Sequence, residues 1–543
     1  MTRTRRSGVP MVLAVAALLL AACSGSDGDS TSDSAGDGTT QADVDAVKAE
    51  VADLEAQLAE AQADVGAATA QVATATLETL MVVQAGELAP AVAAEPLGDG
   101  WATSESERGG LYLVAEFDSS GPDAWDIAAH PRVYFSSESY ASSFFTDTDE
   151  GKTLKADPGF ENFVGWHAID AYTKEVVASA QYKFEDAAEI VRGPHGVGVS
   201  PDGQWGYVGW TEELDGVRNN YAAVIDTQTM KMSKLFKQES WFEGGLRGQA
   251  LHHIQGWSDL EGNDYIILQW GFGATGGPHF ILNPNDDNKV IKAITRQDVA
   301  PIGHPFTTPS PDGQWVYVSV GSNQVRDVHA PAAGVAKVNV ITGEVIYIMG
   351  TGHHPIGITH TQDGRFTYVV DGHSSYLYKI DNELNEVVDE TSTGIAGPYG
   401  ICLDRDETHA WIDGKGEGTH NVGNSMGIVD LTSFSAARDM GTLPFHLGGS
   451  ASSVDHCALH PDPDVNEIWV SNMKGWETIV VNLDSLTVTD YIATPNGGDT
   501  HGMAFVWYDG GWENGELQSD MGGPKSVSFR ADVLERAAAA AAG

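Results

Sequence analysis

The chain has 543 residues, of which 42% are hydrophobic, 62 are Gly and only 3 are Cys. A chain of this length and apolar content can bury a large core, which excludes a wholly disordered protein and a small disulfide scaffold. Acidic residues outnumber basic ones by 76 to 30, which gives a net charge of −46. This charge repels phosphate backbones, so the sequence predicts no nucleic-acid partner.

The first 23 residues have the pattern of a bacterial export signal. Arg3, Arg5 and Arg6 precede an apolar run from Val9 to Leu20, and a run of about 12 residues is too short to span a bilayer. The ending Leu20-Ala21-Ala22-Cys23 resembles the lipobox of bacterial lipoproteins. The resemblance implies that residues 1–23 are a signal peptide, that Cys23 is lipidated, and that the protein is anchored to the cell membrane on its extracytoplasmic side.

Two segments of different composition follow the signal. Residues 24–40 are almost entirely Ser, Gly, Asp and Thr, a composition that favours a disordered tether. Residues 41–83 carry apolar side chains in alternating steps of three and four, at Val44, Val47, Val51, Leu54, Leu58, Ala61, Val65, Ala68 and Val72. This spacing predicts a coiled-coil helix that can hold a homo-oligomer together, and the alternative is a lone amphipathic helix.

One pattern recurs through residues 100–530: a Gly/His/Pro turn, a short apolar strand, a polar turn and an aromatic strand. Two clear copies of the polar turn are Ser200-Pro201-Asp202-Gly203 and Ser310-Pro311-Asp312-Gly313. Copies begin near residues 130, 195, 253, 304, 354, 399, 456 and 501, at steps of about 45 to 65 residues. The spacing predicts an all-β propeller with seven blades, with eight as the alternative, followed by a short tail at 531–543.

This series of turns resembles the YVTN-type repeats of bacterial extracytoplasmic propellers. The resemblance covers about four-fifths of the chain and implies the fold. It does not imply one activity, because propellers carry many unrelated functions.

Histidines recur at the start of several repeats. His195 directly follows the turn proline of its repeat, whereas His304 and His354 directly precede theirs. His253, His456 and others lie where the alignment of the repeats is looser. The strand entered there is the innermost one of a blade, so these side chains should converge on the central channel. His456 is one residue out of phase, and strand alternation would turn it away from the channel. Imidazole is a ligand for copper, zinc, iron and nickel, and an extracytoplasmic location favours copper.

A propeller with converging histidines resembles two copper enzyme families, thiocyanate dehydrogenase and the catalytic domain of nitrous oxide reductase. The second family also has a copper domain with paired cysteines, which has no counterpart here, so the first is the closer match. The resemblance implies a multinuclear copper site and an oxidoreductase that acts on a small inorganic anion or a nitrogen or sulfur compound and passes electrons to an acceptor protein. The implied metal ligands are His130, His195, His354, His420, His456 and His501.

Charged residues complete the predicted site. Asp455 and Asp499 are adjacent or close to candidate ligands and are the candidate catalytic groups, which would orient an imidazole or take a proton. An anionic substrate needs a cationic partner, for which Arg132 and Arg192 are the candidates near His130 and His195.

Two other functions fit the same repeats. A non-catalytic binding or scaffold lipoprotein would use its loops and hold no stoichiometric metal. A lactonase-like hydrolase would place a few carboxylates around one hard cation such as calcium. Cys402 and Cys457 lie on the first strands of adjacent repeats, where they form either a disulfide or two buried thiols.

Overall fold

The computed structural model describes residues 81–84, 111–139, 163–183, 189–214, 217–238, 251–270, 278–294, 298–299, 302–321, 333–416, 423, 425–439, 453–473 and 475–520. The predicted signal peptide at 1–23, with Cys23, the tether at 24–40 and the tail at 531–543 lie outside these residues. So does most of the predicted coiled coil, whose last residues are instead part of strand β1 (Met81–Gln84). The described part of the chain has no helix long and apolar enough to cross a membrane.

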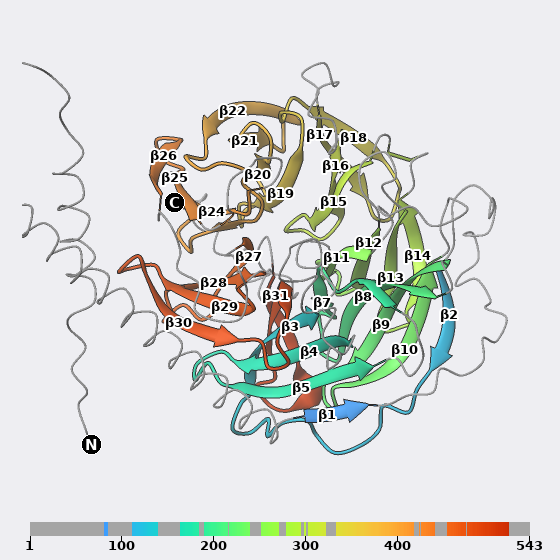
Figure 1. Cartoon of the computed structure of the whole chain (residues 1–543). Helices are drawn as coiled ribbons and strands as arrows, with labels where there is room; N and C mark the ends of the chain where they lie inside the picture. The colour runs from blue at the N-terminus through green and yellow to red at the C-terminus, as the bar shows by residue number, and fades with distance from the viewer. Residues whose placement is uncertain are drawn as a thin grey trace, which may run out of the picture. The chain divides into compact units, whose positions relative to one another are not determined.

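The described strands form seven β-sheets arranged around one centre, as Figure 1 shows. Five of the sheets have four consecutive antiparallel strands, so the predicted all-β propeller is confirmed. Blade 3 holds β11 (Leu251–Ser258), β12 (Asp264–Trp270), β13 (His279–Asn283) and β14 (Lys289–Ile294), and blade 4 holds β15 (Ile302–Pro309), β16 (Trp315–Val320), β17 (Gly334–Asn339) and β18 (Val345–Met349).

The other three regular blades follow in chain order. Blade 5 holds β19 (Pro355–His360), β20 (Phe366–Asp371), β21 (Tyr376–Asp381) and β22 (Glu386–Ser392). Blade 6 holds β23 (Ile401–Leu403), β24 (His409–Gly414), β25 (Ser425–Asp430) and β26 (Ser435–Asp439). Blade 7 holds β27 (Val454–Leu459), β28 (Glu467–Asn472), β29 (Glu477–Asn482) and β30 (Thr487–Ala493).

Blades 1 and 2 have extra strands. Blade 2 has a divided inner strand, and its order is β6 (Glu189–Arg192) with β7 (Val197–Val199), β8 (Trp205–Leu214), β9 (Val217–Asp226), β10 (Lys231–Gln238) and β2 (Leu111–Glu116). Blade 1 runs from β32 (Glu516–Asp520) through β31 (Asp499–Trp507), β3 (Arg132–Ser139), β4 (Phe163–Asp170) and β5 (Val176–Lys183) to β1. A short 3-10 helix, η3 (Trp512–Asn514), links β31 to β32.

Blade 1 closes the ring and decides the number of blades. Its inner strand β31 comes from the C-terminal end of the propeller, whereas β3, β4 and β5 come from the N-terminal end. The repeats that begin near residues 130 and 501 therefore belong to one blade, and the propeller has seven blades rather than eight. His130 precedes β3, which is the second strand of its blade and not the innermost one.

The repeated Ser-Pro-Asp-Gly turn joins the first and second strands of a blade. Ser200 Oγ accepts a hydrogen bond from Trp205 N (2.9 Å), and Asp202 accepts one from Gln204 N (3.0 Å). Gly203 has a φ of 74°, a left-handed conformation that favours glycine. Ser310, Asp312 and Gly313 repeat the arrangement in blade 4, which explains why the motif recurs with the period of the blades.

The hydrophobic core lies between neighbouring blades. Strands such as β4 are buried at every residue, because both faces of the sheet are covered. One cluster joins Tyr207 and Phe236 of blade 2 to Ile254 and Phe280 of blade 3. Among the described residues, five tryptophans are fully buried: Trp166, Trp210, Trp257, Trp270 and Trp469.

Cys402 on β23 and Cys457 on β27 form a disulfide between the inner strands of blades 6 and 7. Both cysteines are buried. Of the two alternatives that the sequence left open, the structure has the disulfide. The bond links two strands that begin next to the histidine cluster described below.

Candidate metal centre

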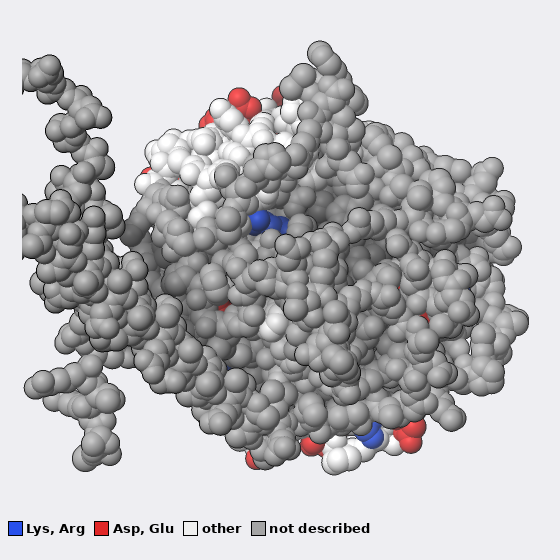
Figure 2. Space-filling view, in the orientation of Figure 1, with Lys and Arg blue, Asp and Glu red and all other residues white. Residues whose placement is uncertain are grey.

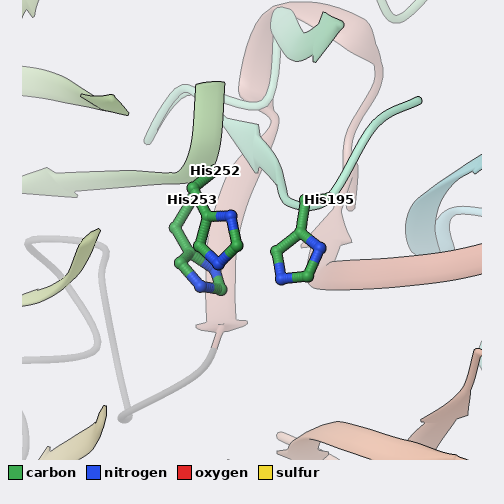
Figure 3. A group of neighbouring side chains, drawn as sticks. All are labelled: His195, His252 and His253. Carbon is green, nitrogen blue, oxygen red and sulfur yellow. The ribbon is translucent and has the colours of Figure 1, made fainter. Parts of the chain in front are cut away.

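Histidines from four blades meet around the axis of the propeller. They are His195, just before β7, His252 and His253 on β11, His456 on β27 and His501 on β31. The rings of His195 and His252 are stacked with centroids 3.7 Å apart, and the rings of His195 and His501 are 4.1 Å apart. All five side chains are at least 96% buried. Figure 3 shows His195 facing the adjacent pair His252 and His253.

A β-bulge in β11 and another in β27 explain why two neighbouring residues of one strand can both reach the histidine cluster. On β11, Leu251 pairs with Trp270 and His253 pairs with Gln269, so His252 is an extra residue. On β27, Val454 pairs with Asn472 and His456 with Ser471, which makes Asp455 the extra residue. A bulge interrupts strand alternation, and two consecutive side chains therefore reach the site from each of these strands.

Close packing of the inner strands also requires glycine. A Cβ added to Gly502, which has a φ of 59°, would lie 2.5 Å from the backbone nitrogen of Val197. A Cβ on Gly196 would lie 2.9 Å from the carbonyl oxygen of His252. Because glycine has no Cβ, the strands that carry His501, His195 and His252 can lie this close together.

Tyr399, from the turn before β23 in blade 6, points its hydroxyl at three of the imidazoles. The phenol oxygen is 3.1 Å from His195 Nε2, 3.3 Å from His252 Nε2 and 3.2 Å from His253 Nε2. Tyr399 is fully buried.

Asp455 contacts four polar groups of the cluster. Its Oδ2 lies 2.7 Å from His501 Nδ1 and 3.7 Å from Lys415 Nζ. Its Oδ1 accepts a hydrogen bond from Ser471 Oγ (2.7 Å) and lies 3.3 Å from His456 Nδ1. A carboxylate in contact with Nδ1 fixes the orientation of an imidazole and leaves Nε2 for another partner.

Lys415, which directly follows β24, is the cation of this site. Its ammonium group lies 3.7 Å from the centroid of the Tyr399 ring, a distance suited to a cation–π interaction. The side chain is 4% exposed. On the face shown in Figure 2, basic atoms are visible near the middle and again at the lower rim, where acidic atoms lie beside them.

Burial and local charge determine the protonation of the cluster. Burial, with the charges of His252 and His501 adding to it, holds the pKa of His195 well below its ordinary value. Burial also lowers the pKa of His456. Burial acts against ionisation of Asp455, but His501 and His456 outweigh it and hold its pKa well below the usual range. His195 and His456 are therefore neutral at neutral pH, which is the form that binds a metal.

His501 and Asp413 shift in the other direction. Burial lowers the pKa of His501, but the charge and hydrogen bond of Asp455 outweigh it and raise the value. Burial, with the charge of Asp455, raises the pKa of Asp413 well above its ordinary value. Neither carboxyl oxygen of Asp413 has a hydrogen-bond partner among the described residues, and burial beside the charged Asp455 favours the protonated form of this carboxyl.

Two groups of side chains in the cluster can each hold a metal ion. The first is His195, His252 and His253, and the second is His195, Asp455 and His501. Within each group the potential ligand atoms lie within 4.8 Å of one another. His195 belongs to both groups, so two metal sites would be neighbours.

The structure brings together some of the residues predicted from the sequence. His195, His456, His501 and Asp455 lie in the cluster, and Asp499 Oδ2 lies 3.9 Å from His501 Nε2. His456 reaches the channel although strand alternation predicted the opposite, because of the bulge at Asp455.

Other predicted residues lie elsewhere. His130 is partly exposed, and its Nδ1 lies 2.8 Å from Asp170 Oδ2. It lies two residues before Arg132, which pairs with Trp507, whereas His501 pairs with Ser137 further along the same two strands. His130 is therefore at the other end of blade 1 from His501. His354 stacks on His373 with centroids 4.5 Å apart, and its backbone N–H donates to Asp371. His420 and the side chains of His304 and Arg192 lie outside the described residues.

The cation beside the histidines is also not the one that the sequence predicted. Arg132 pairs with Asp509 (2.7 Å) and Asp462 (3.1 Å) and covers Trp507, on the same side of blade 1 as His130. Lys415 takes the expected place beside the histidines. Sequence reasoning missed Lys415 and His252 and named residue 399 only as the start of a repeat. It placed His253 among the histidines that should converge on the channel, but not among the implied metal ligands.

No protein-family model and no curated protein matches the chain. Among solved structures, dihydro-heme d1 dehydrogenase NirN in complex with DHE is 14% identical over 71% of this chain and 77% of its own, with a TM-score of 0.41. A putative 6-phosphogluconolactonase from Bacteroides uniformis is 12% identical over 69% of this chain and 100% of its own, with a TM-score of 0.44. Hydrazine synthase from Kuenenia stuttgartiensis is 15% identical over 62% and 93%, with a TM-score of 0.39.

Proposed function

We propose that the protein is a copper-dependent oxidoreductase whose axial histidine cluster acts on a small inorganic anion. The observation that carries the proposal is the pair of buried donor groups that share His195. Two such groups side by side suit a multinuclear centre, and a histidine-rich donor set suits copper. Bound copper would accept electrons from the anion and release them to an acceptor protein.

The donor chemistry favours this function over a lactonase-like hydrolase. Calcium takes six to eight oxygen ligands, whereas the imidazoles here outnumber the carboxylates. The carboxylate of Asp455 lies against the Nδ1 atoms of His501 and His456 and accepts a hydrogen bond from Ser471 Oγ. Those contacts suit a residue that orients ligands rather than one that binds a hard cation.

In this proposal, the side chains of the axial cluster have different roles. His195, His252 and His253 would hold one metal ion, and His195, Asp455 and His501 would hold the second. Asp455 also lies against the Nδ1 atoms of His501 and His456 and fixes their orientation. Lys415 attracts the anion to a site that the strongly acidic protein would otherwise make repulsive. Asp413, neutral and unpartnered among the described residues, can hold a proton. The resemblance to thiocyanate dehydrogenase makes thiocyanate the first substrate to test.

Replacing His195 with Ala should remove copper from both donor groups, because both contain this side chain. We expect about two copper ions per wild-type chain and almost none per His195→Ala chain, measured by mass spectrometry of metal content after dialysis. His279→Ala is the matched control, since His279 is a fully buried histidine on β13, outside the cluster. A wild-type chain that holds no stoichiometric copper would favour the binding or scaffold function instead.

We also propose that the mature protein is anchored to the extracytoplasmic face of the membrane through lipidated Cys23. The disulfide between Cys402 and Cys457 supports an oxidising compartment. Cys23→Ser should move the protein from the membrane fraction to the soluble fraction and prevent incorporation of labelled fatty acid. Recovery of the variant in the membrane fraction, at the level of the wild type, would contradict the anchor.

A further inference from the structure

The hydroxyl of Tyr399 occupies an unusual position for a buried phenol. Its oxygen lies 3.1 to 3.3 Å from the Nε2 atoms of His195, His252 and His253, which come from two other blades. All three imidazoles point their Nε2 atoms at this one oxygen. The four atoms therefore converge on one small region inside the propeller.

Hydrogen bonding alone can satisfy this arrangement in only one way. A neutral phenol donates one hydrogen bond and accepts at most two. The phenol can therefore satisfy three imidazoles only if it donates to one of them and accepts from the other two. Each of those two then carries its proton on Nε2 and its lone pair on Nδ1, on the far side of the ring. Their Nε2 atoms could then hold no metal.

The same distances are close to the spacing of ligands around a metal ion. Nitrogen and oxygen ligands lie about 2.0 to 2.2 Å from a four-coordinate metal, so on a tetrahedron they are about 3.3 to 3.6 Å from one another. The separations between Tyr399 Oη and the three Nε2 atoms are 3.1, 3.3 and 3.2 Å. These three separations are short enough for the phenol oxygen to share one ion with the histidines, whose potential ligand atoms lie within 4.8 Å of one another.

We propose that Tyr399 is the fourth ligand of the metal held by His195, His252 and His253, and that it binds as a phenolate. The inference rests on the proposed metal site. On binding, the metal–oxygen bond replaces the O–H bond and the proton leaves to solvent. Lys415 assists, because a positive charge 3.7 Å from the ring centroid stabilises the phenolate over the phenol. An anionic oxygen ligand also favours copper(II) over copper(I), which prefers soft sulfur ligands.

The test is the absorption and resonance Raman spectrum of the full mature chain loaded with copper(II). Wild-type protein should show a phenolate-to-copper charge-transfer band and, on excitation in that band, ring vibrations that shift when the protein is made with ring-deuterated tyrosine. Tyr399→Phe should lose the band and these vibrations and bind copper at least tenfold more weakly. Tyr317→Phe is the matched control, because Tyr317 is also buried and loses a hydrogen bond, from its hydroxyl to Asn382 (3.0 Å), outside the cluster.

The outcomes separate this inference from the proposed function. Copper binding with no phenolate signal in the wild type would overturn the ligand role of Tyr399 and leave the metal site intact. A wild-type chain that binds no copper would overturn both. Because the isotope shift is measured on the wild-type sequence, the inference can be tested even where Tyr399→Phe does not fold.

Discussion

Replacement of Asp455 with Asn should lower copper affinity by about 10- to 100-fold, which is the usual effect of removing a group that orients metal ligands. The carboxylate lies 2.7 Å from His501 Nδ1 and 3.3 Å from His456 Nδ1. An amide has one oxygen and one NH₂ group, so it can no longer accept from both rings. Competition with a chelator of known affinity measures the change.

The same residue should control stability, because it balances the buried charge of Lys415 (Nζ to Oδ2, 3.7 Å). Breaking a buried ion pair by removing one partner costs about 3 to 5 kcal/mol, so Asp455→Ala should unfold at a clearly lower temperature than the wild type.

Asp404→Asn is the control for the copper-affinity measurement. Asp404 pairs with His409 (3.0 Å) away from the channel, where both side chains are partly exposed, and its loss should leave copper binding unchanged. Wild-type copper affinity in Asp455→Asn would show that the carboxylate does not orient the ligands.

The fold could be predicted because local chemistry and blade period coincide. Each Ser-Pro-Asp-Gly turn forms its own hydrogen bonds, such as that from Trp205 N to Ser200 Oγ (2.9 Å), and each is followed by an apolar strand. The number of blades was left between seven and eight because ring closure is not local. The repeats near residues 130 and 501 are far apart in sequence, yet they supply β3 and β31 of one sheet.

The site was predicted less completely, for two physical reasons. First, strand alternation allows one of two neighbouring residues to face the channel, and the bulges that bring in both His252 and His253, or both Asp455 and His456, have no clear sequence signal. Second, Lys415 follows the second strand of blade 6 rather than the first. Inspection of inner strands alone therefore could not find it, and the position equivalent to the histidines in that blade holds Tyr399.

Replacement of Lys415 with Gln should weaken the binding of small anions to the copper-loaded protein by about 100-fold. Two unit charges about 4 Å apart interact by about 4 kcal/mol at an effective dielectric constant of about 20, which sets an upper limit of about 1000-fold. The carboxylate of Asp455 already neutralises part of this charge, so the effect should fall below the limit. Lys415→Arg keeps the charge and should lose less.

Azide is a suitable probe, since it is a small linear anion whose binding to copper(II) changes the visible spectrum without turnover. Titration with azide gives the dissociation constant, and the kcat/KM for thiocyanate should fall in parallel. Lys337→Gln is the matched control, because Lys337 is a buried lysine that lies 5.0 Å from the ring centroid of Trp315, on β17 of blade 4 and outside the channel. Equal azide affinity in wild type and Lys415→Gln, with copper content retained in both, would mean that the anion is recognised by the metal alone and that Lys415 serves only to balance Asp455.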